Sequence, residues 1–123
     1  MYKILIVEDD PLIASSLARQ LTRWNYEATY VQEFDHVMQE FEKAQPDLVL
    51  MDITLPYFSG YYWCAEIRKI SRVPIVFLSS AADEMNQVMA LSMGADDFIA
   101  KPFDLSVLTA KVQAVLRRAY EFS

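Results

Sequence analysis

Short apolar segments alternate with amphipathic stretches along the whole chain, and no other feature restricts its fold as strongly. Each apolar segment has the length of a strand, and the stretches between them repeat apolar residues at helical spacing. The predicted strands are residues 3–7, 27–31, 48–51, 74–78 and 97–100, and the predicted helices are residues 11–24, 35–44, 61–70, 83–93 and the segment from 105 onward. Five such βα units predict an α/β fold, a doubly wound, five-stranded parallel sheet with helices on both faces.

Single residues support these boundaries. Pro11 suits the first turn of a helix, because its missing N–H is not needed there. Gly94 can end the helix over 83–93 in a left-handed conformation, and residues 54–60, with Pro, Ser and Gly, predict a loop. Apolar stripes define the inner faces of the first and last helices: Leu12, Ile13, Leu17 and Leu21, and Leu105, Leu108, Val112, Val115 and Leu116.

The composition indicates one compact domain without a nucleic-acid-binding surface of its own. The 123 residues are 54% hydrophobic and carry a net charge of −6, whereas phosphate backbones attract clustered Lys and Arg. Cys64 has no second cysteine to pair with, so we expect a small buried side chain, and we expect His36 at the surface. The chain begins without a signal peptide and has no apolar run of bilayer length, which predicts a cytoplasmic protein without membrane contact.

Polar side chains follow every predicted strand but the second. In an open α/β sheet, ligands bind outside the carboxyl ends of the strands, so residues at these ends meet at one edge. Taken one at a time, such residues are typical helix caps, turn formers or solvated side chains. Their convergence at one edge instead favours a functional site. The residues are Glu8, Asp9 and Asp10, then Asp52, then Ser79 and Ser80, and finally Lys101.

The residue types at this edge suit phosphoryl chemistry. Converging carboxylates need a cation, and oxygen ligands select a hard ion such as Mg²⁺ or Ca²⁺. A metal beside a carboxylate makes attack on phosphorus feasible, because it neutralises the incoming charge. Asp52 is then a candidate nucleophile that forms an aspartyl phosphate. Lys101 could pair with the phosphoryl oxygens, and the Ser79 hydroxyl could donate a hydrogen bond to one of them.

Five stretches match a known family in order and spacing: KILIVEDD, PDLVLMDITLP, SG, VPIVFLSS and GADDFIAKPF. Through them, residues 2–118 resemble the CheY-like receiver domain of bacterial two-component response regulators. The resemblance implies a flavodoxin-like fold with strand order 2-1-3-4-5. GADDFIAKPF and AVLRR look most like the OmpR/PhoB subfamily, whose members carry a C-terminal winged-helix DNA-binding domain. We therefore expect a receiver domain over residues 1–119 and, over 120–123, the start of a linker to a DNA-binding domain absent from this sequence.

The resemblance also implies roles for the acidic residues. Asp52 would accept a phosphoryl group from a sensor histidine kinase, so that the domain is a signalling module, not an enzyme, and catalyses only its own phosphorylation and dephosphorylation. Asp9 would bind Mg²⁺ directly and Glu8 directly or through water. Asp52 and the backbone carbonyl of Thr54 would complete the protein ligands, and Mn²⁺ or Ca²⁺ could substitute for Mg²⁺. Asp10 would cap the following helix.

By the same resemblance, residues of the last two strands detect the phosphoryl group. Ser79 takes the position of the switch hydroxyl, and Lys101 matches the lysine that binds the phosphoryl group, with a cis peptide bond before Pro102. Phe98 takes the aromatic switch position, where the subfamily often has Tyr. Phe can swing inward, but it cannot offer a hydroxyl at the surface.

The subfamily often dimerises on phosphorylation through the face of helix 4, strand 5 and helix 5. On this face, Asp97 and Lys111 could supply one charge pair and Leu91 an apolar anchor. Gln87 and Val107 fall where a second pair is usually charged, which weakens the polar rim of such a dimer. DNA would be bound only through the missing C-terminal domain.

The segment LPYFSGYYWCAEIR is unusually aromatic. It resembles regulators linked to peptide-antibiotic sensing and efflux transporters, which implies control of the transcription of antimicrobial-peptide resistance genes. Its aromatic side chains either pack the loop and the third helix or form a partner surface beside the phosphorylation site. They are Tyr57, Phe58, Tyr61, Tyr62 and Trp63.

Three other functions compete with this interpretation. A haloacid dehalogenase-type phosphatase needs a second Asp two residues after its nucleophile, and that position here is Thr54. A nucleotide- or flavin-binding domain needs glycines after the first strand, but the only glycines are Gly60 and Gly94. A stand-alone receiver that signals through protein contacts fits the same residues. In a receiver, the side chains of Thr54 and Ala81 would tune hydrolysis, and since neither orients water well, we expect slow to moderate self-dephosphorylation.

Overall fold

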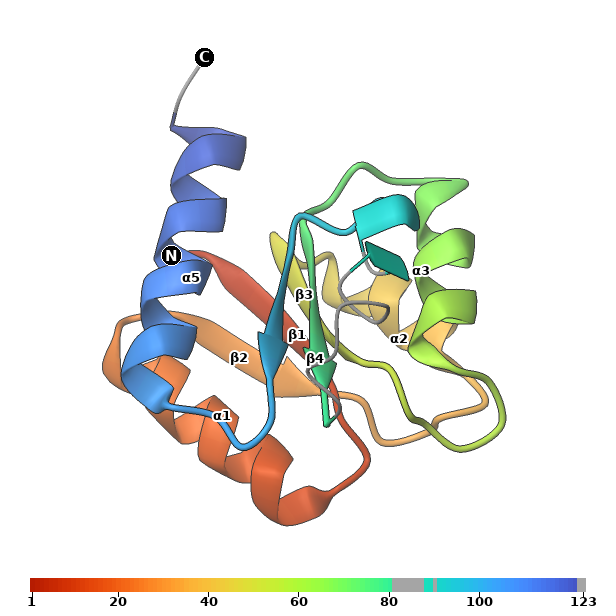
Figure 1. The fold of residues 1–123 in the computed structure, drawn as a ribbon, viewed down its shortest axis with the longest axis horizontal. Helices are drawn as coiled ribbons and strands as arrows, with labels where there is room; N and C mark the ends of the chain where they lie inside the picture. The colour runs from red at the N-terminus through yellow and green to blue at the C-terminus, as the bar shows by residue number, and fades with distance from the viewer. Residues whose placement is uncertain (81–87, 90, 122–123) are drawn as a thin grey trace.

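A computed structural model describes residues 1–80, 88–89, 91 to 121 of the chain, and within them a five-stranded parallel sheet forms the centre (Figure 1). Its strand order is β2-β1-β3-β4-β5, as predicted. Every pair of neighbouring strands is parallel, so all five carboxyl ends lie at one edge. The strands are β1 (Lys3–Val7), β2 (Glu27–Tyr30), β3 (Leu48–Asp52), β4 (Ile75–Ser79) and β5 (Asp97–Ala100).

Helices cover both faces of the sheet. In Figure 1, α1 (Pro11–Arg23) and α5 (Leu105–Tyr120) lie on one side of it, and α2 (Val37–Ala44) and α3 (Gly60–Arg68) lie on the other. Residues 88–89 and 91–92 are also helical and fall in the predicted helix 83–93, of which residues 83–87 and 90 lie outside the described residues and Met93 lies in a turn. Gly94 follows with a φ of +92°, the left-handed conformation expected of a helix end.

The central strands are apolar on both faces because each face has its own core. In β1, Ile4 and Ile6 pack in the cluster that contains α1 and α5, whereas Leu5 and Val7 pack in the cluster that contains α2 and α3. Successive side chains of a strand point to opposite faces, so an unbroken apolar run serves both layers. All five residues of β3 and all five of β4 are buried.

The structure corrects three local predictions. Leu12 was expected on the inner face of the first helix, but it is 80% exposed, because at 3.6 residues per turn it lies on the opposite side of α1 from the buried Leu21. Helix α2 begins at Val37 and not at residue 35, so His36 precedes the helix and caps it without a side-chain hydrogen bond. Helix α3 spans Gly60–Arg68 and not 61–70, because Ser59 caps its first turn by accepting from the N–H of Tyr62.

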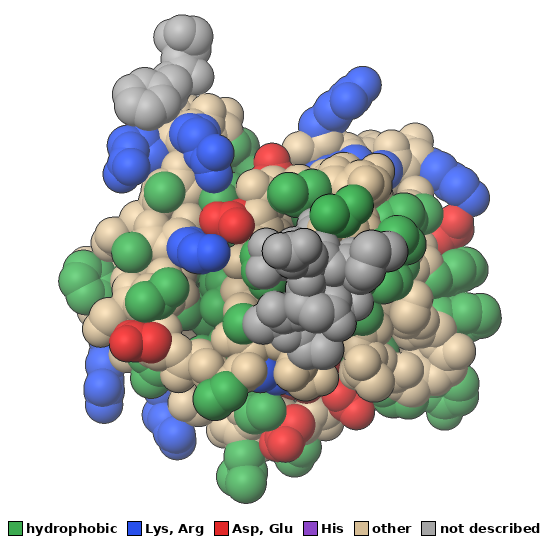
Figure 2. Space-filling model, in the orientation of Figure 1, with side chains coloured by type: hydrophobic (Ala, Val, Ile, Leu, Met, Phe, Trp, Pro, Cys, Tyr) green, Lys and Arg blue, Asp and Glu red, His purple; other side chains and the backbone are tan. Residues whose placement is uncertain are grey.

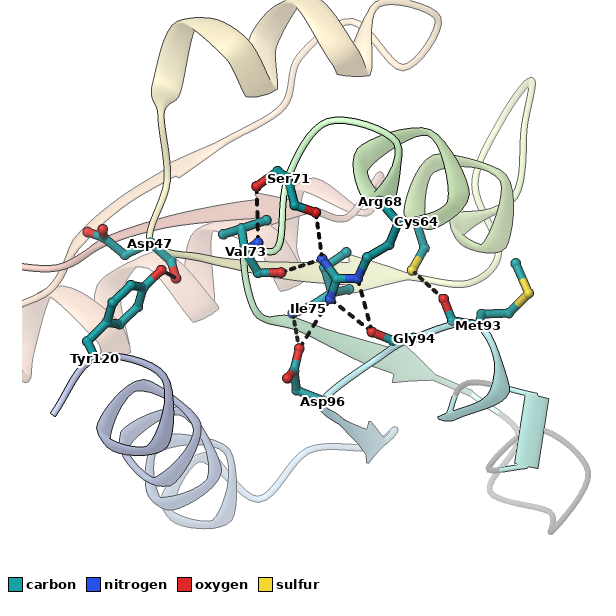
Figure 3. A network of polar contacts seen from close by, with 10 residues as sticks. All are labelled: Asp47, Cys64, Arg68, Ser71, Val73, Ile75, Met93, Gly94, Asp96 and Tyr120. Atoms are coloured by element: carbon teal, nitrogen blue, oxygen red, sulfur yellow. Dashed lines mark hydrogen bonds and ion pairs between the residues drawn. The ribbon is translucent and has the colours of Figure 1, made fainter. Parts of the chain in front are cut away.

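Arg68 ties the end of α3 to the amino ends of β4 and β5 (Figure 3). Its guanidinium donates to the carbonyl of Val73 at 2.6 Å and to the carbonyl of Gly94 at 2.9 Å. It also pairs with Asp96 at 3.3 Å, and Asp96 in turn accepts from the N–H of Ile75 at 2.9 Å. One side chain therefore satisfies backbone groups from segments that are far apart in the sequence.

The last turn of α5 is anchored at the same end of the sheet. The hydroxyl of Tyr120 donates to the carbonyl of Asp47 at 2.6 Å (Figure 3), and its ring stacks on Tyr2 with 5.5 Å between centroids. The Tyr2 hydroxyl donates to Glu121 at 3.0 Å. These contacts hold the described C-terminal residues at the sheet edge opposite the carboxyl ends of the strands.

We expect Arg68→Met to lower the free energy of unfolding by about 2 kcal/mol, because charged hydrogen bonds are lost and backbone carbonyls lose their donor. Urea denaturation checks this. The control is Arg72→Met, at an exposed position four residues later, which should change stability by less than about 0.5 kcal/mol. Equal effects of the two substitutions would contradict the assignment.

Candidate functional site

The predicted site residues meet at the carboxyl edge of the sheet. Glu8 directly follows β1, Asp52 ends β3, Ser79 ends β4 and Lys101 directly follows β5. Acidic side chains appear at this lower edge of the molecule in Figure 2, toward which the arrowheads of β4 and β5 point in Figure 1. Glu8, Asp52 and Ser79 are each no more than 3% exposed.

The ammonium group of Lys101 joins the two buried carboxylates. Its Nζ lies 2.5 Å from Oε1 of Glu8 and 3.1 Å from Oδ2 of Asp52. The other Glu8 oxygen accepts from the N–H of Asp10 at 3.1 Å. The backbone also positions Lys101, because its N–H donates to the carbonyl of Ser79 at 2.6 Å, and the peptide bond to Pro102 is cis, as the family resemblance implied.

Three carboxylates converge beside this ammonium. Glu8, Asp9 and Asp52 each offer an oxygen, and these oxygens lie within 4.8 Å of one another. Burial raises the pKa of Glu8, which the hydrogen bonds from Lys101 and the Asp10 N–H oppose and Asp52 reinforces. Burial and the nearby Glu8 likewise raise the pKa of Asp9. A single ammonium does not balance three acids, so the donor set fits a divalent cation with oxygen ligands.

Lys101 itself remains strongly basic. Burial alone would lower its pKa, but hydrogen bonds to Glu8 and Asp52, together with the charges of both acids, raise it overall. A lysine held in this way is a permanent cation at the sheet edge. It can pair with any further oxyanion that arrives next to Asp52.

The strand register places the two predicted switch residues on one face of the sheet. Phe77 pairs with Phe98 and Ser79 pairs with Ala100 across β4 and β5. Because side chains alternate along a strand, Ser79 and Phe98 point to the same side, with Phe98 packed at the border of the α2–α3 core. Of the hydrolysis positions, Thr54 is exposed in the loop after β3, and Ala81 lies outside the described residues.

The residues predicted for a dimer face lie near β5. Leu91 is 56% exposed and Val107 is 47% exposed, so both can contact a partner. Asp97 and Lys111 form an ion pair of 3.5 Å within the chain. Gln87 lies outside the described residues.

The structure confirms the predicted helix cap, the buried cysteine and the surface histidine. Asp10 caps α1, since its Oδ1 accepts from the N–H groups of Leu12 and Ile13. Cys64 is buried, and its thiol donates to the carbonyl of Met93 at 3.4 Å (Figure 3). His36 is exposed and pairs with Asp35 at 2.8 Å.

The end of β2 carries more polar groups than predicted. Oxygen and nitrogen atoms of Glu33, Asp35 and His36 lie within 4.8 Å of one another, and all three residues are exposed. This group was not predicted from the sequence, because the acids come several residues after the strand and not directly at its end.

The aromatic segment divides between core and surface. Trp63 is buried and Tyr61 packs edge-on against Phe77 at 5.3 Å, in agreement with the structural interpretation. Phe58 stacks on Tyr62 at 4.3 Å, yet these rings remain 45% and 41% exposed, and Tyr57 is 74% exposed. These exposed rings lie in the loop after β3 and the first turn of α3, where the partner surface was predicted.

Gly60 was expected at the end of a loop, and its close approach to the backbone of Asp52 was not predicted. A Cβ at residue 60 would lie 2.1 Å from the backbone oxygen of Asp52. The N–H of Gly60 donates to the carbonyl of Ile53 at 2.8 Å. The start of α3 therefore presses on the backbone of Asp52, and only glycine fits there.

Comparison with known proteins identifies the arrangement. The response regulator receiver domain model matches residues 4–113. The chain belongs to this family. Its receiver-family resemblance, including the OmpR/PhoB type, is thereby confirmed, as is the fold. Receiver domains are signalling domains that bind Mg²⁺ at an acidic pocket and interact with sensor histidine kinases.

Similar proteins include regulators from several bacteria. The receiver is 52% identical over 120 residues to the uncharacterized transcriptional regulatory protein YvcP of Bacillus subtilis, covering 98% of this chain and 51% of that protein. It is 47% identical to the response regulator protein GraR of Staphylococcus epidermidis, covering 98% and 54%. The chain thus spans about half the length of these relatives.

A solved structure supports the same assignment. The N-terminal domain of the nisin resistance regulator NsrR, described as a lantibiotic response regulator, superposes with a TM-score of 0.88 at 56% identity, covering 95% of this chain and 99% of that one. Within the described part of the receiver, no helix is both long and apolar enough to cross a membrane.

We expect Gly60→Ala to lower the free energy of unfolding by about 2–3 kcal/mol, because the added methyl group meets a backbone oxygen that cannot rotate away. Thermal and urea unfolding measure the loss. Ser59→Ala serves as the control for a disturbed helix start and should cost about 1 kcal/mol through loss of the cap. A Gly60→Ala protein as stable as the wild type would refute the close approach to Asp52.

Proposed function

We propose that this receiver accepts a phosphoryl group on Asp52 from a sensor histidine kinase, with Mg²⁺, and that phosphorylation changes the face of the predicted helix 83–93, β5 and α5. The convergence of Glu8, Asp9 and Lys101 on the buried carboxylate of Asp52 carries this proposal. The acids would gather a cation, and the lysine would meet the phosphoryl group. Asp52 would be the residue modified.

The acids of β1 and the loop after β3 would hold the metal. Asp9 and Asp52 would bind it directly, Glu8 directly or through water, and Thr54 through its backbone carbonyl. When bound, Mg²⁺ would offset the negative charge of the carboxylates and of the phosphoryl oxygens. Mn²⁺ or Ca²⁺ could take its place, because all of these donors are hard oxygens.

Asp52 would then act as the nucleophile. One of its oxygens would form a bond to phosphorus as the bond from phosphorus to the histidine nitrogen of the kinase breaks. Lys101, already 3.1 Å from Asp52, needs only a small movement to pair with the phosphoryl oxygens. Its contact with Glu8 keeps the ammonium at the site beforehand, which reduces the ordering needed during transfer.

The response would spread through β4 and β5. The Ser79 hydroxyl would donate to a phosphoryl oxygen, and the Phe98 ring, on the same face of the sheet, would move inward toward Ser79. This is a two-state switch biased by a local charge. The changed face would favour a homodimer in which Leu91, Asp97 and Lys111 take part.

The biological output is part of the proposal. In a protein of the length of YvcP or GraR, the remaining half would bind DNA, and the dimer would control transcription in the cytoplasm, with residues 120–123 at the start of the linker. The similarity to NsrR, described as a nisin resistance regulator, supports a role in resistance to peptide antibiotics. Thr54 and Ala81 would make self-dephosphorylation slow to moderate.

Treatment with acetyl phosphate and Mg²⁺ should add one phosphoryl group per chain, because Asp52 is proposed as the single nucleophile of the acidic cluster, beside Lys101. Intact-mass spectrometry measures the gain. The Asp52→Asn protein keeps the shape of the side chain but removes the nucleophilic oxygen, so it should stay unmodified. An unmodified wild type would sink the proposal, and steady turnover of p-nitrophenyl phosphate would favour the phosphatase alternative.

Asp9→Asn should weaken Mg²⁺ binding about tenfold or more, since it removes one charged ligand from the cluster. Isothermal titration calorimetry or an NMR titration with Mg²⁺ measures the dissociation constant. Asp35→Asn, in the exposed acidic group after β2, is the matched control and should bind Mg²⁺ as the wild type does. Equal affinities of Asp9→Asn and wild type would exclude Asp9 as a ligand.

A further inference from the structure

Lys111 reaches from α5 around the open edge of the sheet to Phe98. Its Nζ donates to the carbonyl of Phe98 at 2.9 Å and lies 5.5 Å from the centroid of the Phe98 ring. It also pairs with Asp97 at 3.5 Å, and the same Asp97 oxygen accepts from the N–H of Phe98 at 2.8 Å. Both backbone polar groups of Phe98, and its ring, are therefore engaged by side chains of this edge.

The position of β5 explains why this contact is available. β5 is the outermost strand of the sheet, and an edge strand leaves backbone groups unpaired on its outer side. The Lys111 side chain is 35% exposed, so its ammonium stands at the rim and not inside the core. The Phe98 ring is only partly buried. An ammonium within about 6 Å of a ring centroid is attracted to the face of that ring.

Inward movement of Phe98 has a cost in this arrangement. The carbonyl of Phe98 belongs to the strand and stays where it is, so Lys111 keeps that hydrogen bond. The ring, however, would leave the ammonium as it moves toward Ser79 on the inner side. Lys111 therefore distinguishes the two ring positions, which is what a ligand or contact must do to shift a two-state equilibrium.

We propose that Lys111 is a latch that holds the Phe98 ring at the outer edge of the sheet and so opposes the phosphorylation-dependent switch. This proposal rests on the proposed function, because the latch acts on the movement that phosphorylation of Asp52 would drive. Lys111 is a positioning residue, since it contacts neither the phosphoryl group nor the metal. By linkage, loss of the latch raises the apparent affinity for a phosphoryl group by the same factor by which the latch favours the outer position.

The test uses beryllofluoride with saturating Mg²⁺, a non-covalent mimic of a phosphoryl group on a carboxylate. NMR titration of the wild type and of Lys111→Met gives the apparent dissociation constants. Methionine keeps an apolar stem against the ring and removes the charge. We expect Lys111→Met to bind beryllofluoride about fivefold more tightly, which corresponds to about 1 kcal/mol, the size of a partly exposed ring–ammonium contact.

Two further variants separate the latch from a general structural effect. Lys111→Arg keeps the cation over the ring and should bind beryllofluoride within about twofold of the wild type. Lys69→Met removes an exposed lysine of α3 that pairs with Glu66, and it should leave the affinity unchanged. Urea denaturation of the same proteins measures the free energy of unfolding. If Lys111 had only a structural role, Lys111→Met would lower this free energy without changing the affinity for beryllofluoride.

A second readout follows the ring without ligand. The Phe98 ring resonances, assigned by comparison with Phe98→Leu, should lie in ligand-free Lys111→Met part of the way toward their beryllofluoride-bound positions. Unchanged or weaker beryllofluoride binding by Lys111→Met, with unmoved ring resonances, would overturn the latch and leave the proposed function intact. A wild type that binds no beryllofluoride would overturn both, because no switch would exist for the latch to restrain.

Discussion

The ammonium group of Lys101, shared between buried Glu8 and Asp52, is the interaction on which the acidic edge depends. Two carboxylates taken out of water next to each other would repel, and removal of their counter-charge would leave uncompensated buried charge. Lys101 comes from the end of β5, whereas Asp52 ends β3, and β4 lies between them at strand spacings of about 4.8 Å each.

The fold and the acidic site follow from local sequence, whereas several contacts do not. Strand ends can be read from apolar runs, and the parallel topology then brings Glu8 and Asp52 to one edge. Helical spacing was misapplied to Leu12, which lies two and a half turns from Leu21 and therefore on the outer side of α1. Gly60 and Arg68 depend on backbone distances between segments far apart in the chain, and no local pattern contains such distances.

The contacts of β5 with Lys101 and Lys111 likewise depend on distances that no local sequence pattern contains. Its sequence predicts a short strand, and the family resemblance implies an aromatic switch position in it, but neither predicts that one lysine lies at each side of this edge strand. Lys101 leaves the carboxyl end of the strand toward the acids, and Lys111 covers the outer side of Phe98. One ammonium would respond to the phosphoryl group itself and the other to the ring that moves in consequence. The ammonium groups of Lys101 and Lys111 thus lie on two sides of β5, the strand between the acidic site and the predicted dimer face.

The docking of Tyr120 against Tyr2 and Asp47 has a practical consequence. The end of α5 packs at the edge of the sheet opposite Asp52, so a domain fused after Glu121 would lie away from the acidic edge. A fluorescent reporter or an unrelated effector domain could be fused at this position without blocking access of a kinase to the carboxyl edge of the sheet.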